Sequence, residues 1–295
     1  MGLPRFSIGK RISRRHFLAA CVFAAGGVGV YAAGIERHWI ETTRRDVFLP
    51  GLPQAFDGFR IVQLTDIHFD EYTEPFLLRQ AVAQINRMNP DAVLLTGDFI
   101  TFGFWPRRYF PVHARQCGEI LSHLNCARRY AVLGNHDMLV GKRKIIDALT
   151  PTGITVLDNA YLPIECAGSR IWLAGLEDPV MGKPDLDAAI PGSIRNVPQE
   201  PVILMCHAPD YIDELISQPA GQAVSFMLSG HTHGGQVRLP FIGPIVLPEL
   251  GRRYVEGWFR VGEMQLYVNR GLGSMGLPIR FNCPPEIALF TLRSA

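Results

Sequence analysis

Five short apolar runs in this chain each end at a cluster of polar side chains, and this repeated pairing limits the possible folds more than any other feature. The runs are rich in β-branched and aliphatic residues and almost continuously hydrophobic, which is typical of strands buried on both faces of a sheet. They are Arg60–Thr65, Ala92–Thr96, Arg129–Leu133, Val202–Met205 and Ala223–Leu228.

Segments with helical periodicity lie between several of these runs. In Glu74–Asn89 the apolar residues recur at the spacing of one helix face: Phe76, Leu77, Ala81, Val82, Ile85 and Met88. Three further segments are similar: Tyr109–Leu124, Arg143–Leu149 and Tyr211–Ile216. Strands that alternate with helices predict βαβ units in an α/β fold. The second half of the chain is richer in strands, so two sheets packed face to face, with helices outside, would accommodate all the elements.

The polar clusters follow the predicted strands directly. They are Asp66-Ile67-His68, Gly97-Asp98, Gly134-Asn135-His136-Asp137, Cys206-His207 and Gly230-His231-Thr232-His233-Gly234-Gly235. Ligands of open α/β sheets bind beyond the carboxyl ends of the strands, so we expect these side chains to meet. Carboxylates, imidazoles and one amide suit hard or borderline metal ions. Seven candidate ligands exceed the needs of one ion and suit two ions that share a carboxylate, roughly 3.5–4 Å apart.

Each residue also has a simpler interpretation. Asp98 after Gly97 could form a turn, as could Asn135. His136 and His207 taken singly could be buried histidines of the core. Asp137 could cap a helix N-terminus. A further acidic pair, Glu177-Asp178, follows the strand-like segment 171–176, and we interpret it as structural.

The ordered set Asp-x-His, Gly-Asp, Gly-Asn-His-Asp, His and Gly-His-x-His resembles the calcineurin-like metallophosphoesterases from about Gly58 to the C-terminus. The fold that this resemblance implies is a four-layer α/β/β/α sandwich. The tail narrows the resemblance, because Tyr267–Gly273, Leu277–Arg280 and Pro284–Ile287 are similar to exported bacterial phosphodiesterases of the superfamily. The same subgroup is similar to lipid A pathway enzymes that cleave UDP-2,3-diacylglucosamine.

The resemblance also implies a role for each polar residue. The implied metal ligands are Asp66, His68 and His233 for a first ion, Asn135, His207 and His231 for a second, and Asp98 as the bridge. The ions would be manganese, iron or zinc. His136 would act as a general acid, and Asp137 would orient it by accepting a hydrogen bond from its other ring nitrogen. The implied reaction is in-line attack on phosphorus by a metal-bridging hydroxide.

The N-terminus predicts a targeting segment. Ser13-Arg14-Arg15-His16-Phe17-Leu18 matches the twin-arginine export pattern, and the uncharged apolar stretch Phe17–Ala33 follows. Residues 1–35 are therefore expected to be a twin-arginine signal peptide or an N-terminal membrane anchor, with cleavage open. Residues 36–57 would form a connector and lead-in strand, and residues 58–295 the metallophosphoesterase domain. The expected partner is the twin-arginine translocation machinery, and the expected location is the periplasm or the outer face of the cytoplasmic membrane.

Charge argues against one class of partner. The first 35 residues carry five basic residues and no acidic ones, so the remaining chain holds 24 basic and 27 acidic residues. A nucleic-acid-binding domain is usually strongly basic, and this balance does not predict one.

Apolar loops beside the predicted site bear on the substrate. The proline-rich stretch Val237–Pro248 comes soon after His233 and could be a hairpin packed on the core or a wall for acyl chains or a membrane surface. Phe102–Trp105 is a second apolar loop at the same end. Arg107, Arg108 and Arg280 are candidate phosphate clamps. The expected function is a two-metal phosphodiesterase. The alternatives are a UDP-2,3-diacylglucosamine-type pyrophosphatase and a non-catalytic binding protein of the same fold.

Overall fold

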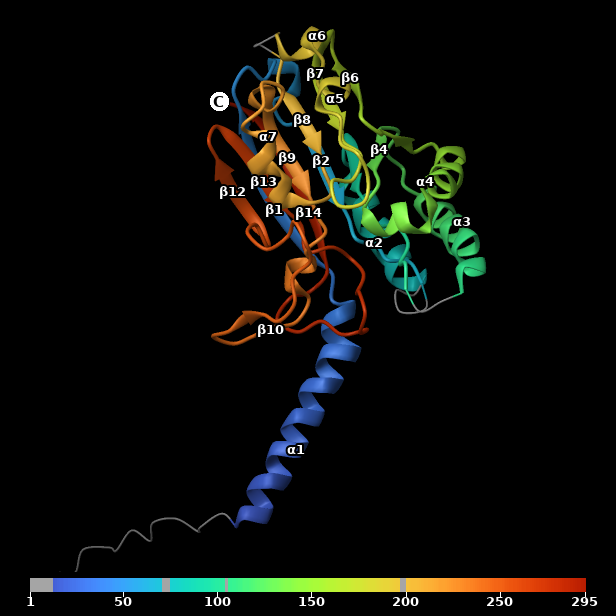
Figure 1. Ribbon diagram of the computed structural model, residues 1–295, viewed down its shortest axis with the longest axis vertical. Helices are drawn as coiled ribbons and strands as arrows, with labels where there is room; N and C mark the ends of the chain where they lie inside the picture. The colour runs from blue at the N-terminus through green and yellow to red at the C-terminus, as the bar shows by residue number, and fades with distance from the viewer. Residues whose placement is uncertain (1–12, 71–74, 104–105, 197–199) are drawn as a thin grey trace, which may run out of the picture.

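Two six-stranded sheets pack face to face, and helices cover their outer faces (Figure 1). The computed structural model describes residues 13–70, 75–103, 106–196 and 200–295. The strand order of the first sheet is β1-β14-β2-β3-β4-β5, and that of the second is β12-β13-β9-β8-β7-β6. The expected four-layer α/β/β/α sandwich is therefore confirmed.

The first sheet contains the three N-terminal strand-like runs. Its strands are β1 (Glu41–Leu49), β14 (Glu286–Ser294), β2 (Arg60–Leu64), β3 (Ala92–Thr96), β4 (Arg129–Val132) and β5 (Thr155–Val156). Strands β2, β3, β4 and β5 are parallel, whereas β14 runs antiparallel to β2 and parallel to β1. The segment 36–57 thus supplies the edge strand of this sheet.

The second sheet contains the other two runs. Its strands are β12 (Gly257–Val261), β13 (Met264–Val268), β9 (Val224–Ser229), β8 (Val202–Met205), β7 (Ser169–Gly175) and β6 (Ala160–Cys166). Strands β7, β8, β9 and β13 are parallel, and β6 and β12 are antiparallel edges. A short hairpin of β10 (Arg238–Leu239) and β11 (Gly243–Pro244) lies outside both sheets.

Three apolar layers stabilise the sandwich. Residues from both sheets, among them Phe226 and Phe290, fill the space between the sheets together with Phe56 from the short helical turn Gln54–Phe56. The outer face of the first sheet packs against α2 (Pro75–Met88), α3 (Phe110–Leu121) and α4 (Asn135–Leu149). The outer face of the second sheet packs against α5 (Leu186–Ala189), α6 (Gly192–Arg195) and α7 (Ile212–Leu215). Burial on both faces explains why the central strands have no polar alternation.

Two helices differ in detail from the expectation. On α2 the predicted face is buried except for Phe76, which is half exposed, and Leu78 is buried in addition. Helix α4 starts at Asn135, whereas the sequence predicted a helix only from Arg143. The strongly positive φ of Gly141 interrupts the helix and hides its first turns from a search for periodicity.

The N-terminal helix stands apart from the sandwich. Helix α1 (Arg14–Val30) projects away from the domain at the bottom of Figure 1, and short helical turns extend it through Tyr31–Ile35 and Glu36–His38. This stretch of 25 residues is the one helix among the described residues that is long and apolar enough to cross a membrane.

Candidate metal centre

The predicted site residues gather at one edge of the sandwich, where parallel strands of both sheets end. Asp66 and His68 follow β2, Asp98 follows β3, and Asn135 opens α4 after β4. From the other sheet, His207 follows β8, while His231 and His233 follow β9. The five motifs converge because the two sheets present the carboxyl ends of these strands to the same cavity.

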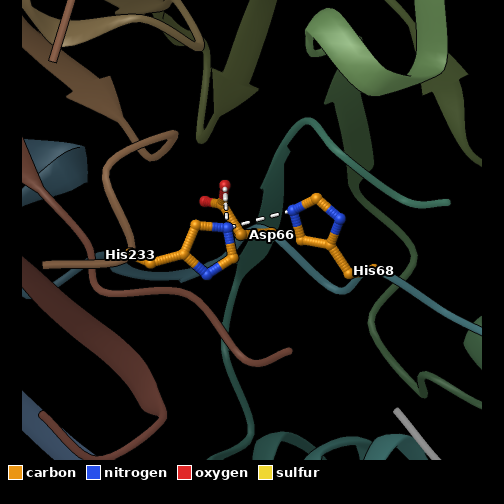
Figure 2. Close-up of side chains that lie close together, drawn as sticks. All are labelled: Asp66, His68 and His233. Atoms are coloured by element: carbon orange, nitrogen blue, oxygen red, sulfur yellow. Dashed lines mark hydrogen bonds and ion pairs between the residues drawn. The ribbon is translucent and has the colours of Figure 1, made fainter. Parts of the chain in front are cut away.

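Asp66, His68 and His233 form one compact group (Figure 2). The Nε2 atoms of His68 and His233 lie 3.0 Å apart, and His233 Nε2 lies 3.4 Å from Asp66 Oδ1. The Nδ1 atom of His68 contacts Thr101 Oγ1 at 3.2 Å, which turns Nε2 toward the group. These three side chains therefore present one oxygen and two nitrogens to a common point.

Asp98, His207 and His231 form a second group beside the first. His207 Nδ1 donates to the carbonyl oxygen of Thr96 at 2.7 Å, so its Nε2 faces Asp98 Oδ2 at 3.2 Å. His231 uses Nε2 to bond the carbonyl oxygen of Glu249 at 2.7 Å, leaving Nδ1 for the site. Main-chain carbonyls that fix a ring in this way also fix which nitrogen can bind a metal.

Asp98 contacts both groups. Its Oδ2 atom lies 3.5 Å from His68 Nε2 as well as 3.2 Å from His207 Nε2. Its Oδ1 atom accepts a hydrogen bond from the backbone N–H of His136 at 2.9 Å, which fixes the carboxylate.

Among the described residues, two buried polar atoms at the site make no hydrogen bond: Asn135 Oδ1, and His207 Nε2, whose near neighbour is Asp98 Oδ2 at 3.2 Å. An unpaired buried polar atom is costly unless another group, such as an ion, satisfies it. Both atoms are of the type that binds metal ions, so the residues present fit a metal centre.

The backbone at the site is strained. Five candidate ligands have positive φ angles between 47° and 72°: Asp66, His68, Asp98, His231 and His233. Such conformations are unfavourable for residues other than glycine and concentrate at functional sites. They bend the chain sharply after each strand, which aims successive polar side chains into one cavity.

Glycine allows the closest approaches. A Cβ atom on Gly134 would lie 2.3 Å from Asp98 Oδ1 and 2.7 Å from His207 Nε2. A Cβ atom on Gly230 would lie 2.2 Å from Asp66 Oδ2. The glycines of these two motifs therefore leave room for the candidate ligands.

His136 is held by the main chain rather than by Asp137. The backbone N–H of Phe102 donates to His136 Nδ1 at 2.9 Å, which places the ring proton on Nε2. Asp137 instead accepts hydrogen bonds from the N–H groups of Phe99 at 2.9 Å and Gly134 at 3.0 Å. The expectation that Asp137 orients the His136 ring is wrong, and its carboxylate instead caps the N-terminus of α4.

Burial governs the protonation of the site. It lowers the pKa of His68 to about 3 and that of His231 to about 4, so both imidazoles are neutral. Burial raises the pKa of Asp66 to about 6. Burial also acts to lower the pKa of His207, but the adjacent Asp98 carboxylate outweighs it and raises this pKa well above its usual value. A bound cation would stabilise the ionised carboxylates in this dehydrated site.

The site opens into a cavity of about 550 Å³. Candidate ligands and His136 form its floor. Its wall is apolar and includes Val237, Ile245, Val246, Leu277 and Ile279. The stretch Val237–Pro248 contains the β10–β11 hairpin and also contributes to the cavity lining.

The segment from Met275 to Ile279 is the part of the wall that the sequence did not predict. This segment does not follow a predicted strand, and its place in the cavity wall depends on contacts with residues distant in the sequence. One is the pair of hydrogen bonds from Gln236 Nε2 to the carbonyl oxygens of Met275 and Leu277, each 3.0 Å.

The three candidate phosphate clamps have different outcomes. Arg280 is fully buried, and its guanidinium donates to main-chain carbonyls, including those of Gly273 and Cys283. It cannot hold a phosphate in the cavity, so that prediction is wrong. The guanidinium of Arg108 lies over the ring of Tyr109 at 5.0 Å, outside the cavity lining. The side chain of Arg107 lies outside the described part of the structure.

Arg280 organises the chain beneath Asp66. The carbonyl oxygens of Gly271 and Gly273 accept from Arg280, and the N–H of Gly273 donates to the carbonyl oxygen of Asp66 at 2.7 Å. A Cβ atom on Gly271 would lie 2.5 Å from Asp66 Cβ. The Arg-Gly-Leu-Gly sequence is thus a close-fitting support for the first group.

Comparison with known proteins identifies the family. A sequence profile described as calcineurin-like phosphoesterase matches residues 59–235, which contain all five motifs. The chain belongs to this family. With its grouped ligand residues, it is a metal-dependent phosphoester hydrolase.

Relatives extend the likeness along the whole chain. The uncharacterized metallophosphoesterase YkuE of Bacillus subtilis is 38% identical, with 97% of this chain and 99% of that protein covered. The phosphodiesterase YaeI of Escherichia coli is 33% identical, with 95% and 99% covered. The UDP-2,3-diacylglucosamine pyrophosphatase LpxG of Chlamydia trachomatis is 28% identical, with 96% and 97% covered.

Among solved structures, the NAD nucleotidase of Haemophilus influenzae superposes with a TM-score of 0.52 at 15% identity. The match covers 72% of this chain and 45% of that one. At this identity the likeness shows the fold alone.

Proposed function

We propose that the protein is a two-metal phosphodiesterase with Asp98 as the bridging ligand. The observation that carries this proposal is the position of Asp98 Oδ2, within 3.5 Å of His68 Nε2 in one group and 3.2 Å of His207 Nε2 in the other. A carboxylate between two sets of ligands is the arrangement that two-metal hydrolases use.

We assign the residues to the two ions as the family resemblance implies. Asp66, His68 and His233 would hold the first ion. Asn135, His207 and His231 would hold the second, and the unpaired Oδ1 of Asn135 supports its inclusion. When bound, the ions would lower the pKa of a water molecule and polarise the phosphoryl oxygens. Manganese, iron and zinc all suit this mixture of oxygen and nitrogen donors.

His136 supplies a hydrogen-bond donor from the protein itself. Its Nδ1 accepts from the N–H of Phe102, so Nε2 carries a proton on a ring that lines the cavity floor. Hydrolysis adds a water oxygen to phosphorus and breaks one ester phosphorus–oxygen bond. The Nε2–H group can donate a hydrogen bond that stabilises the charge developing on a phosphoryl oxygen or on the leaving oxygen.

The cavity favours a diester. A diester carries two organic groups, and the apolar wall beside the ligands provides a surface for the second. The full-length similarity to the E. coli phosphodiesterase supports the same preference. The second candidate is a pyrophosphatase acting on an amphiphile of the UDP-2,3-diacylglucosamine type, which the apolar wall and the Chlamydia relative favour.

The N-terminal segment would place the enzyme outside the cytoplasmic membrane. The twin-arginine motif supports export by the twin-arginine machinery, and α1 would serve as a signal or anchor within residues 1–35. Residues 36–57 would then connect it to the catalytic domain of residues 58–295, contributing β1 to that domain's first sheet.

Hydrolysis assays test the proposal. The metal-loaded full chain should cleave bis-p-nitrophenyl phosphate faster than p-nitrophenyl phosphate, and chelation should abolish both activities. Glu177→Gln is a matched control, because this carboxylate pairs with Lys142 outside the cavity lining. Faster cleavage of the monoester would contradict the diester preference. Failure to cleave either substrate with metal bound would contradict the enzyme's proposed activity.

A further inference from the structure

The mouth of the cavity is surrounded by exposed apolar side chains. On the hairpin β10–β11 and the turn after it, Phe241 is fully exposed, and Ile242 and Val246 are each 75% exposed. Across the mouth, Leu277 is 65% exposed. We define Phe241, Ile242, Ile245, Val246 and Leu277 as the apolar rim.

The rim and the cavity share residues. Ile245, Val246 and Leu277 line the cavity and are also exposed to solvent. Other exposed apolar residues of the sandwich, such as Phe48, Val112 and Ile216, lie singly on separate elements and need no special explanation. A group of large apolar residues around a cavity mouth is instead typical of an interaction surface.

The rim lies at the end of the domain from which α1 projects. In Figure 1 the β10–β11 hairpin lies at the level where α1 meets the sandwich and extends sideways from the helix. Tyr31, Trp39 and Pro240 line a common hollow between the helix end and the hairpin. Trp39 is 63% exposed. Tyrosine and tryptophan favour the boundary between lipid and water, so this level suits the membrane interface.

Hydrogen bonds fasten the helical turns that extend α1, Tyr31–Ile35 and Glu36–His38, to the segment that carries Leu277. The N–H of Arg280 donates to the carbonyl oxygen of Ala32 at 3.1 Å, and Arg37 Nη1 donates to the carbonyl oxygen of Pro278 at 3.1 Å. The direction of the helix is therefore coupled to the Leu277–Arg280 segment, which forms one side of the cavity mouth. A bilayer crossed by α1 would meet the rim.

We propose that the apolar rim inserts into the surface of the membrane that holds α1, so that the cavity opens at the level of the lipid headgroups. This assigns a lipid bilayer as the partner of the rim. Resting on the proposed function, it also assigns the substrate class: a phosphate ester with long hydrocarbon chains, which enters from the bilayer while its phosphate reaches the metal centre. Exposed side chains of Phe, Ile, Val and Leu gain free energy when lipid replaces water around them.

Fluorescence quenching tests the docking. The full chain is reconstituted in phosphatidylcholine and phosphatidylglycerol vesicles with or without lipids brominated in the acyl chains. The tryptophan fluorescence that Phe241→Trp adds to that of the wild type should be at least about half quenched in brominated vesicles. Quenching of this size is expected if the new indole ring lies within the membrane interface. Phe48→Trp is the matched control, because Phe48 is also exposed but lies on β1 away from the rim. Equal quenching of the two variants would overturn the docking surface and point to a partner other than lipid.

Hydrolysis separates the substrate class from the proposed function. Hexadecyl p-nitrophenyl phosphate in vesicles is compared with soluble bis-p-nitrophenyl phosphate. Phe241→Ser/Ile242→Ser, which changes rim residues outside the cavity lining, should slow the vesicle reaction about tenfold or more, because two apolar anchors are lost. The control Phe48→Ser/Ile216→Ser should retain the wild-type rate on vesicles. An unchanged vesicle rate in the rim variant would overturn the substrate class. If wild type cleaves neither substrate, the proposed function fails, and the quenching result still decides the docking.

Discussion

The floor and the wall of the cavity are built in opposite ways. The floor consists of buried side chains on the ends of central strands, held by main-chain hydrogen bonds and strained backbone. Much of the wall lies on a hairpin of two-residue strands and on a loop, with its apolar side chains partly exposed. Rigid elements position reacting groups accurately, whereas loops vary with little effect on the core. We infer that the two sheets fix the positions of the candidate ligands, and we propose that the loops select the substrate.

Loss of Asp98 should impair the metal centre at the cavity floor more than any other substitution. Asp98→Ala should lower kcat/KM for a diester by at least about 10³-fold, because it removes the shared ligand of both proposed ions. Metal content measured by mass spectrometry should fall with it. A variant that keeps both metal and activity would contradict the bridging role.

Loss of His136 should separate catalysis from metal binding. His136→Ala should lower kcat by about 10²–10³-fold, the range for loss of one hydrogen-bond donor to the developing charge. Metal content should stay close to that of wild type. If the variant loses its metal, His136 acts as a ligand and the assignment is wrong.

Replacing Arg280 should show how far the candidate metal ligands depend on the loop that Arg280 holds beneath Asp66. Arg280→Met leaves several buried carbonyl oxygens unpaired, so the free energy of unfolding should fall by about 2–4 kcal/mol. We also expect kcat to fall roughly tenfold, because misplaced reacting groups are inefficient. Denaturant unfolding and steady-state kinetics measure the two effects.

The matched control for Arg280 is Arg293→Met. Arg293 is partly exposed and pairs with Asp46 and Asp57 at 3.4 and 3.7 Å. Its loss should lower the free energy of unfolding by no more than about 1 kcal/mol. Equal destabilisation by the two variants would argue against a special supporting role for Arg280.

Changes in the wall should have the smallest effect. Leu277→Ala should raise KM for a long-chain ester by roughly threefold to tenfold, the effect of losing an apolar contact. The value of kcat should change by less than about twofold, since this contact lies away from the reacting atoms. Ile216→Ala, at the exposed C-cap of α7 and outside the cavity lining, provides the control. A large loss of kcat in Leu277→Ala would show that the wall also orders the floor.

The sequence predicted the cavity floor better than the cavity wall. The apolar runs and the residues after them located the strands and the convergence of Asp66, Asp98 and His207, because carboxyl ends of parallel strands meet at one edge. These features depend on local sequence and a general rule of sheet geometry. The place of Asp98 between the two ligand groups was implied by the family resemblance and not by the topology.

Other features depend on contacts between distant segments. The N–H of Phe102, not Asp137, holds the His136 ring, and a main-chain donor leaves no mark on residue identity. Four loop carbonyls surround the guanidinium of Arg280 and allow it to be buried. The sequence does not show these contacts, so it does not distinguish this buried arginine from a phosphate clamp. The wall formed by Met275–Ile279 is likewise set by tertiary packing.

Anomalous diffraction from crystals of the manganese-loaded protein tests the central claim most directly. If Asp98 bridges two ions, two anomalous peaks should lie roughly 3.5–4 Å apart, one on each side of Asp98. One ion would contact Asp66, His68 and His233, and the other Asn135, His207 and His231. A single peak, or two peaks that do not share Asp98, would contradict the bridging role of Asp98.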